Sequence, residues 1–277
     1  MNKKVKHGTL LTVIFTVLSL LYLYPIVLVF INSFKKKAYI SKAPFEIPTG
    51  KMYVGLENYI RGIKQTGLIQ AFGWSLFITI LSVAVIILCC SMCAWYICRV
   101  KTKFTKILYM LCLFAMIVPS RWKCLHYLDC KYASYGKSVG TDCDLSWIWC
   151  RTGGIYVYRI CKGIPLEIEE AALIDGCSPL QVFFKVLIPI LKPTIISTAI
   201  LELMWVWNDY LLPTLVLDIK KYKTIPMAVQ YFRGSFGHVQ MGPMMASIMI
   251  DIIPIIIVYL VCQKYIIEGV VAGAVKG

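Results

Sequence analysis

Charged residues are scarce in this sequence, and their scarcity limits the classes of protein it can belong to. Only 16% of the 277 residues are charged and 59% are hydrophobic, whereas about 25% are charged in an ordinary soluble domain. This composition excludes a disordered tail, a coiled coil and a small disulfide scaffold. It also argues against a soluble enzyme, because a fold of this size cannot bury so much apolar surface.

Charge is missing altogether from long stretches of the chain. Residues 8–34 and 65–98 contain no formal charge, and residues 193–217 and 234–263 are almost as apolar. A helix that spans a bilayer needs about 20 apolar residues, so these runs predict four transmembrane helices. We expect the first run to be retained, because the apolar part of a cleaved signal peptide is only about 7–15 residues long.

The cysteines lack the spacing of a metal or redox site. Cys90 and Cys93 form a CxxC pair inside the second apolar run, but no second pair accompanies it, and a structural zinc site needs four ligands. We interpret these cysteines as small hydrophobic side chains, and we predict no metal and no cofactor. The net charge of +15 does not predict nucleic-acid binding, because the basic residues lie in loops between the apolar runs.

Residues 120–162 lack the pattern of the rest of the chain. The apolar run before them covers only residues 107–118, and a half-length span cannot satisfy its backbone groups in lipid. The window holds five cysteines, three tryptophans and ten charged residues. One hypothesis is a reading-frame shift that opens near Pro119 and closes near Lys162, which would give six helices in the ancestral chain. The alternative is a genuine extramembrane loop rich in cysteine and tryptophan.

Residues 163–189 carry the most specific pattern, which predicts two short helices separated by Gly176. Glycine permits backbone conformations that are closed to other residues. Ser178 is suited to cap the second helix, with Pro179 in its first turn. The acids Glu167, Glu169 and Glu170 lie near the start of the first helix, where its dipole favours them. Pro165 suits a first-turn position, and Pro189 and Pro193 are expected to mark the turn back into the membrane.

This spacing resembles the EAA motif of ABC-importer permeases. In that family Glu-Ala-Ala is followed by three residues, a glycine, nine residues and an Ile-x-Leu-Pro ending. The matching residues are Glu170, Ala171, Ala172, Gly176 and the segment 186–189, with conservative changes at Val186 and Ile188. Residues 205–209 and 268–277 also resemble the carbohydrate-uptake, maltose-type branch. The likeness is close over residues 163–277, loose over 1–119, and fails over 120–162.

The resemblance implies an all-α integral membrane fold, a six-transmembrane-helix permease bundle that forms one domain over residues 1–277. It would be a multi-pass protein of a bacterial-type plasma membrane. Residues 163–189 would form a cytoplasmic coupling loop that sits in a cleft of an ATPase subunit. The residues implied in ATPase coupling are Glu170, Ala171, Ala172, Asp175, Gly176 and Pro189. The alternative is that Gly176 and the alanines only shape a helix-turn-helix.

The resemblance also implies partners and a substrate class. The partners would be a second permease subunit in a heterodimer, two cytoplasmic ATPase subunits, the lipid bilayer, and an extracellular solute-binding protein that touches residues 35–64. This chain would hydrolyse nothing itself. The cargo would be an oligosaccharide or a related polyol or glycerol phosphate.

Two acidic residues lie within the third apolar run. Glu202 and Asp209 are seven positions apart, which places them on one face of a continuous helix. Acids at membrane depth usually face a bundle interior or a wet cavity. One hypothesis is that both line the translocation path together with Trp205 and Asn208. The alternative places Asp209 near the outer membrane surface, packed against the partner permease.

Three other classes of function compete with the importer. An ion-coupled secondary transporter would relay protons through Glu202, Asp209 and Asp251, but it predicts inverted repeats that the sequence does not show. An intramembrane enzyme would need a matching acidic motif on another span. A non-functional product of a damaged permease gene is the third, because the loss of half a span and one full span would abolish folding.

Overall fold

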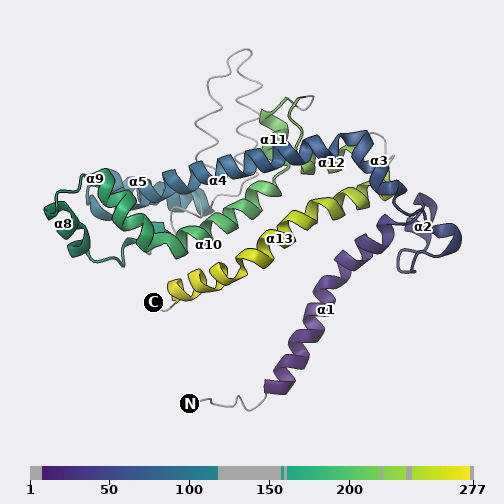
Figure 1. Ribbon diagram of the computed structural model, residues 1–277, viewed down its shortest axis with the longest axis horizontal. Helices are drawn as coiled ribbons and strands as arrows, with labels where there is room; N and C mark the ends of the chain where they lie inside the picture. Colours follow the sequence, from purple (N-terminus) through teal and green to yellow (C-terminus); the bar gives the residue numbers. More distant parts are fainter. Residues whose placement is uncertain (1–7, 118–156, 159–160, 219–220, 235–238, 275–277) are drawn as a thin grey trace. The chain divides into compact units, whose positions relative to one another are not determined.

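The computed structural model describes residues 8–117, 157–158, 161–218, 221–234 and 239–274. Within these residues every regular element is helical, and strand-like pairing is limited to two isolated bridges. The predicted all-α class is therefore confirmed. In chain order (Figure 1) the elements are α1 (Gly8–Ser33), α2 (Lys37–Lys42), η1 (Gly50–Met52), α3 (Glu57–Thr66), α4 (Leu68–Arg99), α5 (Lys103–Ile117), α8 (Leu166–Ile174), α9 (Pro179–Gln181), η2 (Val182–Leu187), α10 (Ile188–Trp207), α11 (Leu211–Val216), α12 (Ile225–Tyr231) and α13 (Met241–Ala274).

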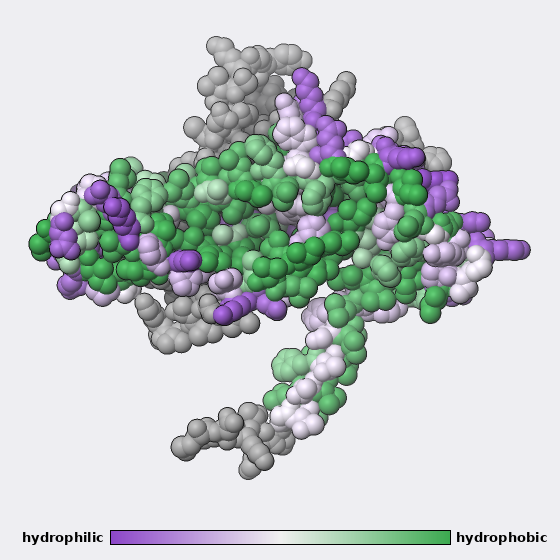
Figure 2. All heavy atoms as spheres, viewed as in Figure 1, coloured by the Kyte–Doolittle hydropathy of each residue, from purple (hydrophilic) through white to green (hydrophobic). Residues whose placement is uncertain are grey.

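Four of the described helical segments are long and apolar enough to cross a membrane. They are Gly8–Ser33, Leu68–Arg99, Pro179–Trp207 and Met241–Tyr265. Their apolar side chains are largely exposed, and Figure 2 shows hydrophobic residues along α4 and much of α1. Such a surface is stable in lipid and unstable in water. The four predicted spans are confirmed in number.

The third span begins and ends earlier than the sequence suggests. We predicted it over residues 193–217, but the helix covers Pro179–Trp207 and α11 follows as a separate short helix. Pro213 explains the break, because proline lacks the N–H that would bond to the carbonyl of Asp209 and its ring would clash there. Asn208 ends the helix, and its side-chain amide donates to the carbonyl of Met204 at 2.8 Å.

The short apolar run before the irregular segment forms α5, which has 15 residues. The irregular segment 120–162 lies outside the described residues, except for residues 157–158 and 161–162. The frame-shift hypothesis and the loop hypothesis therefore both stay predictions.

The described chain divides into two compact units. The first comprises residues 1–75 and 210–257. Its polar core centres on Lys35, which is fully buried and whose Nζ donates to the carbonyls of Ala43 at 2.8 Å and Pro44 at 3.2 Å. Burial lowers the pKa of Lys35, and the charge of Glu46 partly opposes this. The segment after α2 is thus bonded to the end of α1 by the amine of Lys35 and by the side-chain amide of Asn32, which donates to the carbonyl of Pro44 at 2.9 Å.

Close packing of α3 on the start of α13 completes this unit. Gly242 lies directly against Asn58, where an added Cβ would be 2.5 Å from Oδ1 of Asn58. The amide of Asn58 is buried and donates to the carbonyls of Ser33 at 2.8 Å and Lys35 at 2.9 Å. Gly62 makes a similar approach to Ser247. Glycine at both positions lets two backbones meet as they do in transmembrane helix pairs.

The second unit comprises residues 76–209 and 258–277. Its apolar core joins the end of α4 to η2 and α10, through the buried residues Ala94, Phe183, Leu187 and Leu191. The hydroxyl of Ser197 on α10 donates to the carbonyl of Tyr265 on α13 at 2.9 Å. These contacts hold the segment 163–189 against the end of a membrane-spanning helix.

The contact between Gly242 and Asn58 generates a stability prediction. We expect Gly242→Val to lower the free energy of unfolding by about 1–3 kcal/mol, as overpacking does elsewhere, because the added carbons overlap a buried amide. Thermal unfolding of purified protein in detergent measures the effect. Gly73→Ala is the control, since its added Cβ meets nothing within 4 Å, and equal melting temperatures for the two variants would contradict the packing argument.

Candidate functional site

The first helix of the 163–189 segment, α8, begins one residue later than expected. Pro165 is the N-cap and Leu166 is the first helical residue, whereas the sequence placed Pro165 in the first turn. Glu167 and Glu169 do lie in the first turn, where the positive end of the helix dipole favours them.

The end of α8 is a complete Schellman motif built on Gly176. The N–H of Gly176 donates to the carbonyl of Leu173 at 3.0 Å, and the N–H of Cys177 donates to that of Ala172 at 3.0 Å. Gly176 has φ +85°, a left-handed conformation that L side chains adopt at a cost. The space around it is open, with nothing within 4 Å of an added Cβ. The requirement for glycine is therefore conformational and not steric.

The next helix begins at Ser178, as predicted. Its hydroxyl accepts from the N–H of Gln181 at 3.4 Å, while the Gln181 side chain accepts from the N–H of Ser178 at 2.8 Å. This is a capping box. Residues 182–187 then form a π-helix, η2, which continues directly into α10. The predicted turn at Pro189 and Pro193 is wrong, because Pro189 occupies the first turn of α10, where its missing N–H is tolerated.

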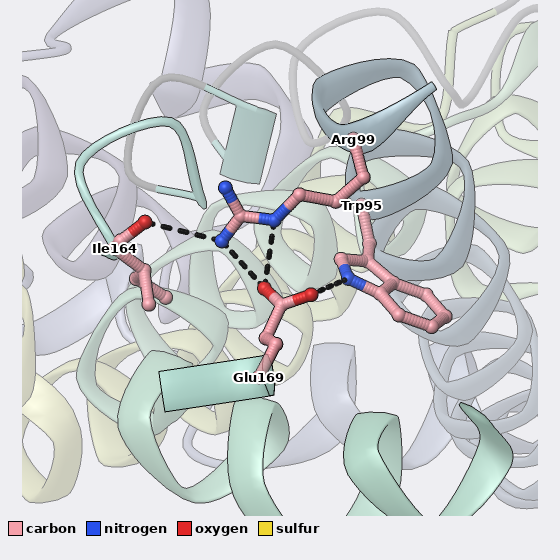
Figure 3. Close-up of polar contacts among 4 residues, drawn as sticks. All are labelled: Trp95, Arg99, Ile164 and Glu169. Atoms are coloured by element: carbon pink, nitrogen blue, oxygen red, sulfur yellow. Dashed lines mark hydrogen bonds and ion pairs between the residues drawn. The ribbon is translucent and has the colours of Figure 1, made fainter. Parts of the chain in front are cut away.

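A buried ion pair fixes α8 to the end of α4. Nε of Arg99 donates to Oε1 of Glu169 at 2.7 Å, and Nη2 donates to the same oxygen at 2.5 Å. Oε2 of Glu169 accepts from Nε1 of Trp95 at 3.0 Å. Nη2 of Arg99 also donates to the carbonyl of Ile164 at 3.1 Å. Figure 3 shows Trp95 and Arg99 meeting at the Glu169 carboxylate, and the carbonyl of Ile164 bonded to the Arg99 guanidinium.

The burial of this pair is nearly complete on the carboxylate side. The side chain of Glu169 is 6% exposed and that of Arg99 is 18% exposed. Apolar packing lies beside it, where the ring of Trp95 is 5.4 Å from that of Phe183. Cys161 is also buried there, and burial, reinforced by the neighbouring Cys98, raises the pKa of its thiol to about 12. That thiol is neutral at physiological pH and packs as an apolar group.

The predicted coupling residues divide into an exposed set and one buried member. Ala172 is buried on the inner side of α8. The exposed members are Glu170, Ala171, Asp175, Gly176 and Pro189. Among them lies an apolar side chain that the sequence reading did not single out, Ile174, which is 85% exposed. Two exposed carboxylates among the predicted coupling residues, Glu170 and Asp175, therefore accompany a prominent aliphatic residue at the end of α8.

The predicted path residues are not brought together on one helix face. Glu202 is buried in α10, but Trp205 is 70% exposed and Asn208 is also exposed. The prediction that Glu202 and Asp209 share a helix face is wrong, because α10 ends at Trp207 and Asp209 follows its C-cap. Asp209 is partly buried in the non-helical connection to α11.

Sequence reasoning missed Trp95, Arg99 and the tertiary role of Glu169. It assigned Glu169 to the helix dipole together with its neighbours. One signal was available, since Arg99 is the first charge after the apolar run 65–98. An arginine at the end of a span is a common partner for a buried acid, but local spacing does not show which of three nearby glutamates it meets.

Comparison with known proteins identifies the family. Residues 145–271 match the family described as the binding-protein-dependent transport system inner membrane component. A probable starch degradation products transport system permease protein, AmyC of Thermoanaerobacterium thermosulfurigenes, is 36% identical over 96% of both chains. The multiple sugar-binding transport system permease protein MsmG of Streptococcus mutans is 33% identical over 95% of both.

The fold is shared with a solved importer. The crystal structure of a bacterial ABC transporter involved in the import of the acidic polysaccharide alginate contains a chain with a TM-score of 0.72 and 19% identity, covering 96% of this chain and 99% of that one. This supports the ABC-importer permease fold. The match to an inner membrane component, together with the four apolar spans among the described residues, supports a multi-pass location in the plasma membrane. By its extended similarity to AmyC and MsmG, the chain belongs to the family of inner membrane components of binding-protein-dependent transport systems, the permease subunits of ABC importers.

Proposed function

We propose that this permease carries a sugar, either an oligosaccharide or a related polyol or glycerol phosphate. The support is the similarity over nearly the whole chain to permeases named for starch degradation products and for multiple sugars. A third relative, the arabinooligosaccharides permease AraQ of Bacillus subtilis, is 26% identical over 96% of this chain. Uptake of labelled oligosaccharides by membrane vesicles that contain the complete transporter tests the class.

We propose further that α8 is the contact with a cytoplasmic ATPase, two copies of which drive a heterodimer of this chain and a second permease. The main support is the exposed surface of α8, where Ile174 lies near Glu170 and Asp175. The opposite side of this helix is fixed by the ion pair between Glu169 and Arg99. An aliphatic anchor surrounded by charges is typical of a protein contact. ATP hydrolysis would take place on the ATPase subunits and not on this chain.

The segment 35–64 is proposed as a contact for the extracellular solute-binding protein. It folds into α2, η1 and α3, beside a cavity of about 670 Å³. Lys36, Lys37 and Arg61 line this cavity, with Glu57 as the lining carboxylate. The excess of positive charge favours a partner with acidic side chains at its surface.

The translocation path is proposed to include Glu202, Trp205, Asn208 and Asp209. Support comes from the break in the helix at Asn208, since non-helical backbone at membrane depth is tolerated only against protein or a wet cavity. Exposed Trp205 would supply an aromatic face to a sugar. Asn208 and Asp209 would supply hydrogen-bonding groups at the point where α10 ends.

The proposed ATPase contact predicts a loss of association when its apolar anchor becomes charged. We expect Ile174→Asp to reduce the amount of ATPase that co-purifies with the permease at least about tenfold, since a hot-spot residue contributes about 2 kcal/mol or more. Pull-down of the tagged complex measures it. Ile47→Asp is the matched control, because Ile47 is 70% exposed in the proposed extracellular segment. Full association of the Ile174 variant would contradict the proposal.

The Schellman motif predicts a graded response at Gly176. The φ of +85° costs a β-branched residue about 1–2 kcal/mol or more, whereas asparagine tolerates that region. We expect Gly176→Val to lower transport and substrate-stimulated ATP hydrolysis several-fold without reducing membrane insertion, and Gly176→Asn to retain most of both activities. Equal activity of the valine and asparagine variants in reconstituted vesicles would show that the turn has no role in coupling.

If these residues line the translocation path, their removal should lower transport without impairing assembly of the transporter. We expect Asn208→Ala and Asp209→Ala each to lower uptake by about tenfold at limiting substrate, the scale of one lost hydrogen bond to the substrate. Uptake is measured in cells whose surface levels of permease are matched. Ser19→Ala on α1, where the hydroxyl bonds only its own helix backbone at 2.7 Å, is the control. Normal uptake at limiting substrate would place these residues outside the path.

A further inference from the structure

The contact between α8 and α4 is short, polar and specific, and the proposed function does not use it. The carboxylate of Glu169 accepts three hydrogen bonds, two from Arg99 and one from Trp95. Arg99 also holds the carbonyl of Ile164, immediately before α8. Charge-assisted hydrogen bonds of this kind are shorter and stronger than neutral ones. The start of α8 and the residue before its N-cap are thus held by one guanidinium (Figure 3).

The same helix, α4, makes a second contact farther along its length within this unit. Val83, Ile86 and Cys90 of α4 are buried against Val206 of α10, and Leu203 packs beside them. Buried Glu202 lies in this stretch of α10. A continuous series of packed residues therefore leads from α8, through Arg99 and α4, to the part of α10 assigned to the translocation path. Contiguous packing of this kind can carry coupling between distant sites.

We infer that the Arg99–Glu169 ion pair transmits the movement of α8 to α4, so that closure of the ATPases displaces α4 and α10 together. Arg99, Glu169 and Trp95 are positioning residues in this scheme, and none of them touches substrate or nucleotide. The inference rests on the proposed contact between α8 and the ATPase. The inference gives two adjacent acids different roles. Glu170 is exposed toward the proposed ATPase contact, whereas Glu169 is buried against α4.

A purely stabilising role for the pair makes a different prediction. Replacing a buried ion pair with well-packed uncharged groups of similar volume costs less stability than removing one partner, because the single change leaves an uncompensated buried charge. Stability and transmission can therefore be separated with neutral variants. Arg99→Gln with Glu169→Gln removes both charges together and keeps polar groups of similar size.

The experiment compares Arg99→Gln, Glu169→Gln and the double variant in the complete transporter, reconstituted with its ATPase, partner permease and solute-binding protein. We expect each single variant to have a lower melting temperature and the double variant to recover it. We expect all three to retain the ATPase and to transport about fivefold less substrate per ATP hydrolysed, the scale on which single residues alter coupling. Substrate uptake and phosphate release are measured on the same vesicles.

Two further variants make the result specific. Trp95→Phe removes one donor to Glu169 but can keep the ring packing on Phe183, and we expect it to lower the ratio of transport to hydrolysis about twofold. Lys103→Gln with Lys106→Gln is the control, because it neutralises two exposed charges at the start of α5 that belong to no proposed contact, and its ratio should equal that of the wild type.

Three outcomes would overturn the inference. A wild-type transport ratio in the stable double variant would show that the pair only stabilises the loop. Loss of the ATPase from the double variant would show that the pair only shapes the docking surface. If the wild-type complex itself holds no ATPase, and Ile174→Asp changes nothing, the proposed function fails and the inference fails with it.

Discussion

The absence of water from the bilayer core is the constraint on which this structure depends. Backbone N–H and C=O groups there have no solvent partner, so each spanning segment must satisfy them within its own helix. Apolar side chains are consequently exposed along α1, α4 and α13, and they carry little information about which helices belong together. The information lies at the helix ends, where polar groups can meet. Lys35, Asn58, Arg99 and Glu169 are all found at or beyond such ends.

The chemistry of helix ends also explains how much of the candidate site could be predicted. The left-handed turn at Gly176 and the cap at Ser178 follow from residue types in local sequence, and both are confirmed. Each motif closes within six residues, so no tertiary knowledge is needed. The four spans likewise follow from composition alone. The prediction fails at Asp209, because hydropathy would continue the helix there, whereas α10 ends at Trp207 and Pro213 lies in the separate helix α11.

The pair Glu169 and Glu170 shows the limit of local reasoning most clearly. The two residues are adjacent and identical, and both lie in the N-terminal half of α8. Only the position of α4 makes one of them buried and the other exposed. That position depends on contacts between residues about seventy apart in sequence, such as Trp95 with Glu169. Hydropathy locates Arg99 at the end of its span but cannot choose its partner among three glutamates.

The two faces of α8 place opposite demands on the chain, and together they explain its construction. An aliphatic side chain as exposed as Ile174 would gain stability if a partner covered it, and the proposed ATPase contact would supply that cover. The inner face is held by charge-assisted bonds to the nearly buried carboxylate of Glu169. A buried ion pair of this kind is weak evidence for net stability. If α8 were loosely attached, a displacement of its outer face would tilt α8 alone and leave α4 in place. Because α8 is pinned at its first turn by Arg99, and because Gly176 ends it without strain, a force on its outer face would move the end of α4 with it in the proposed scheme.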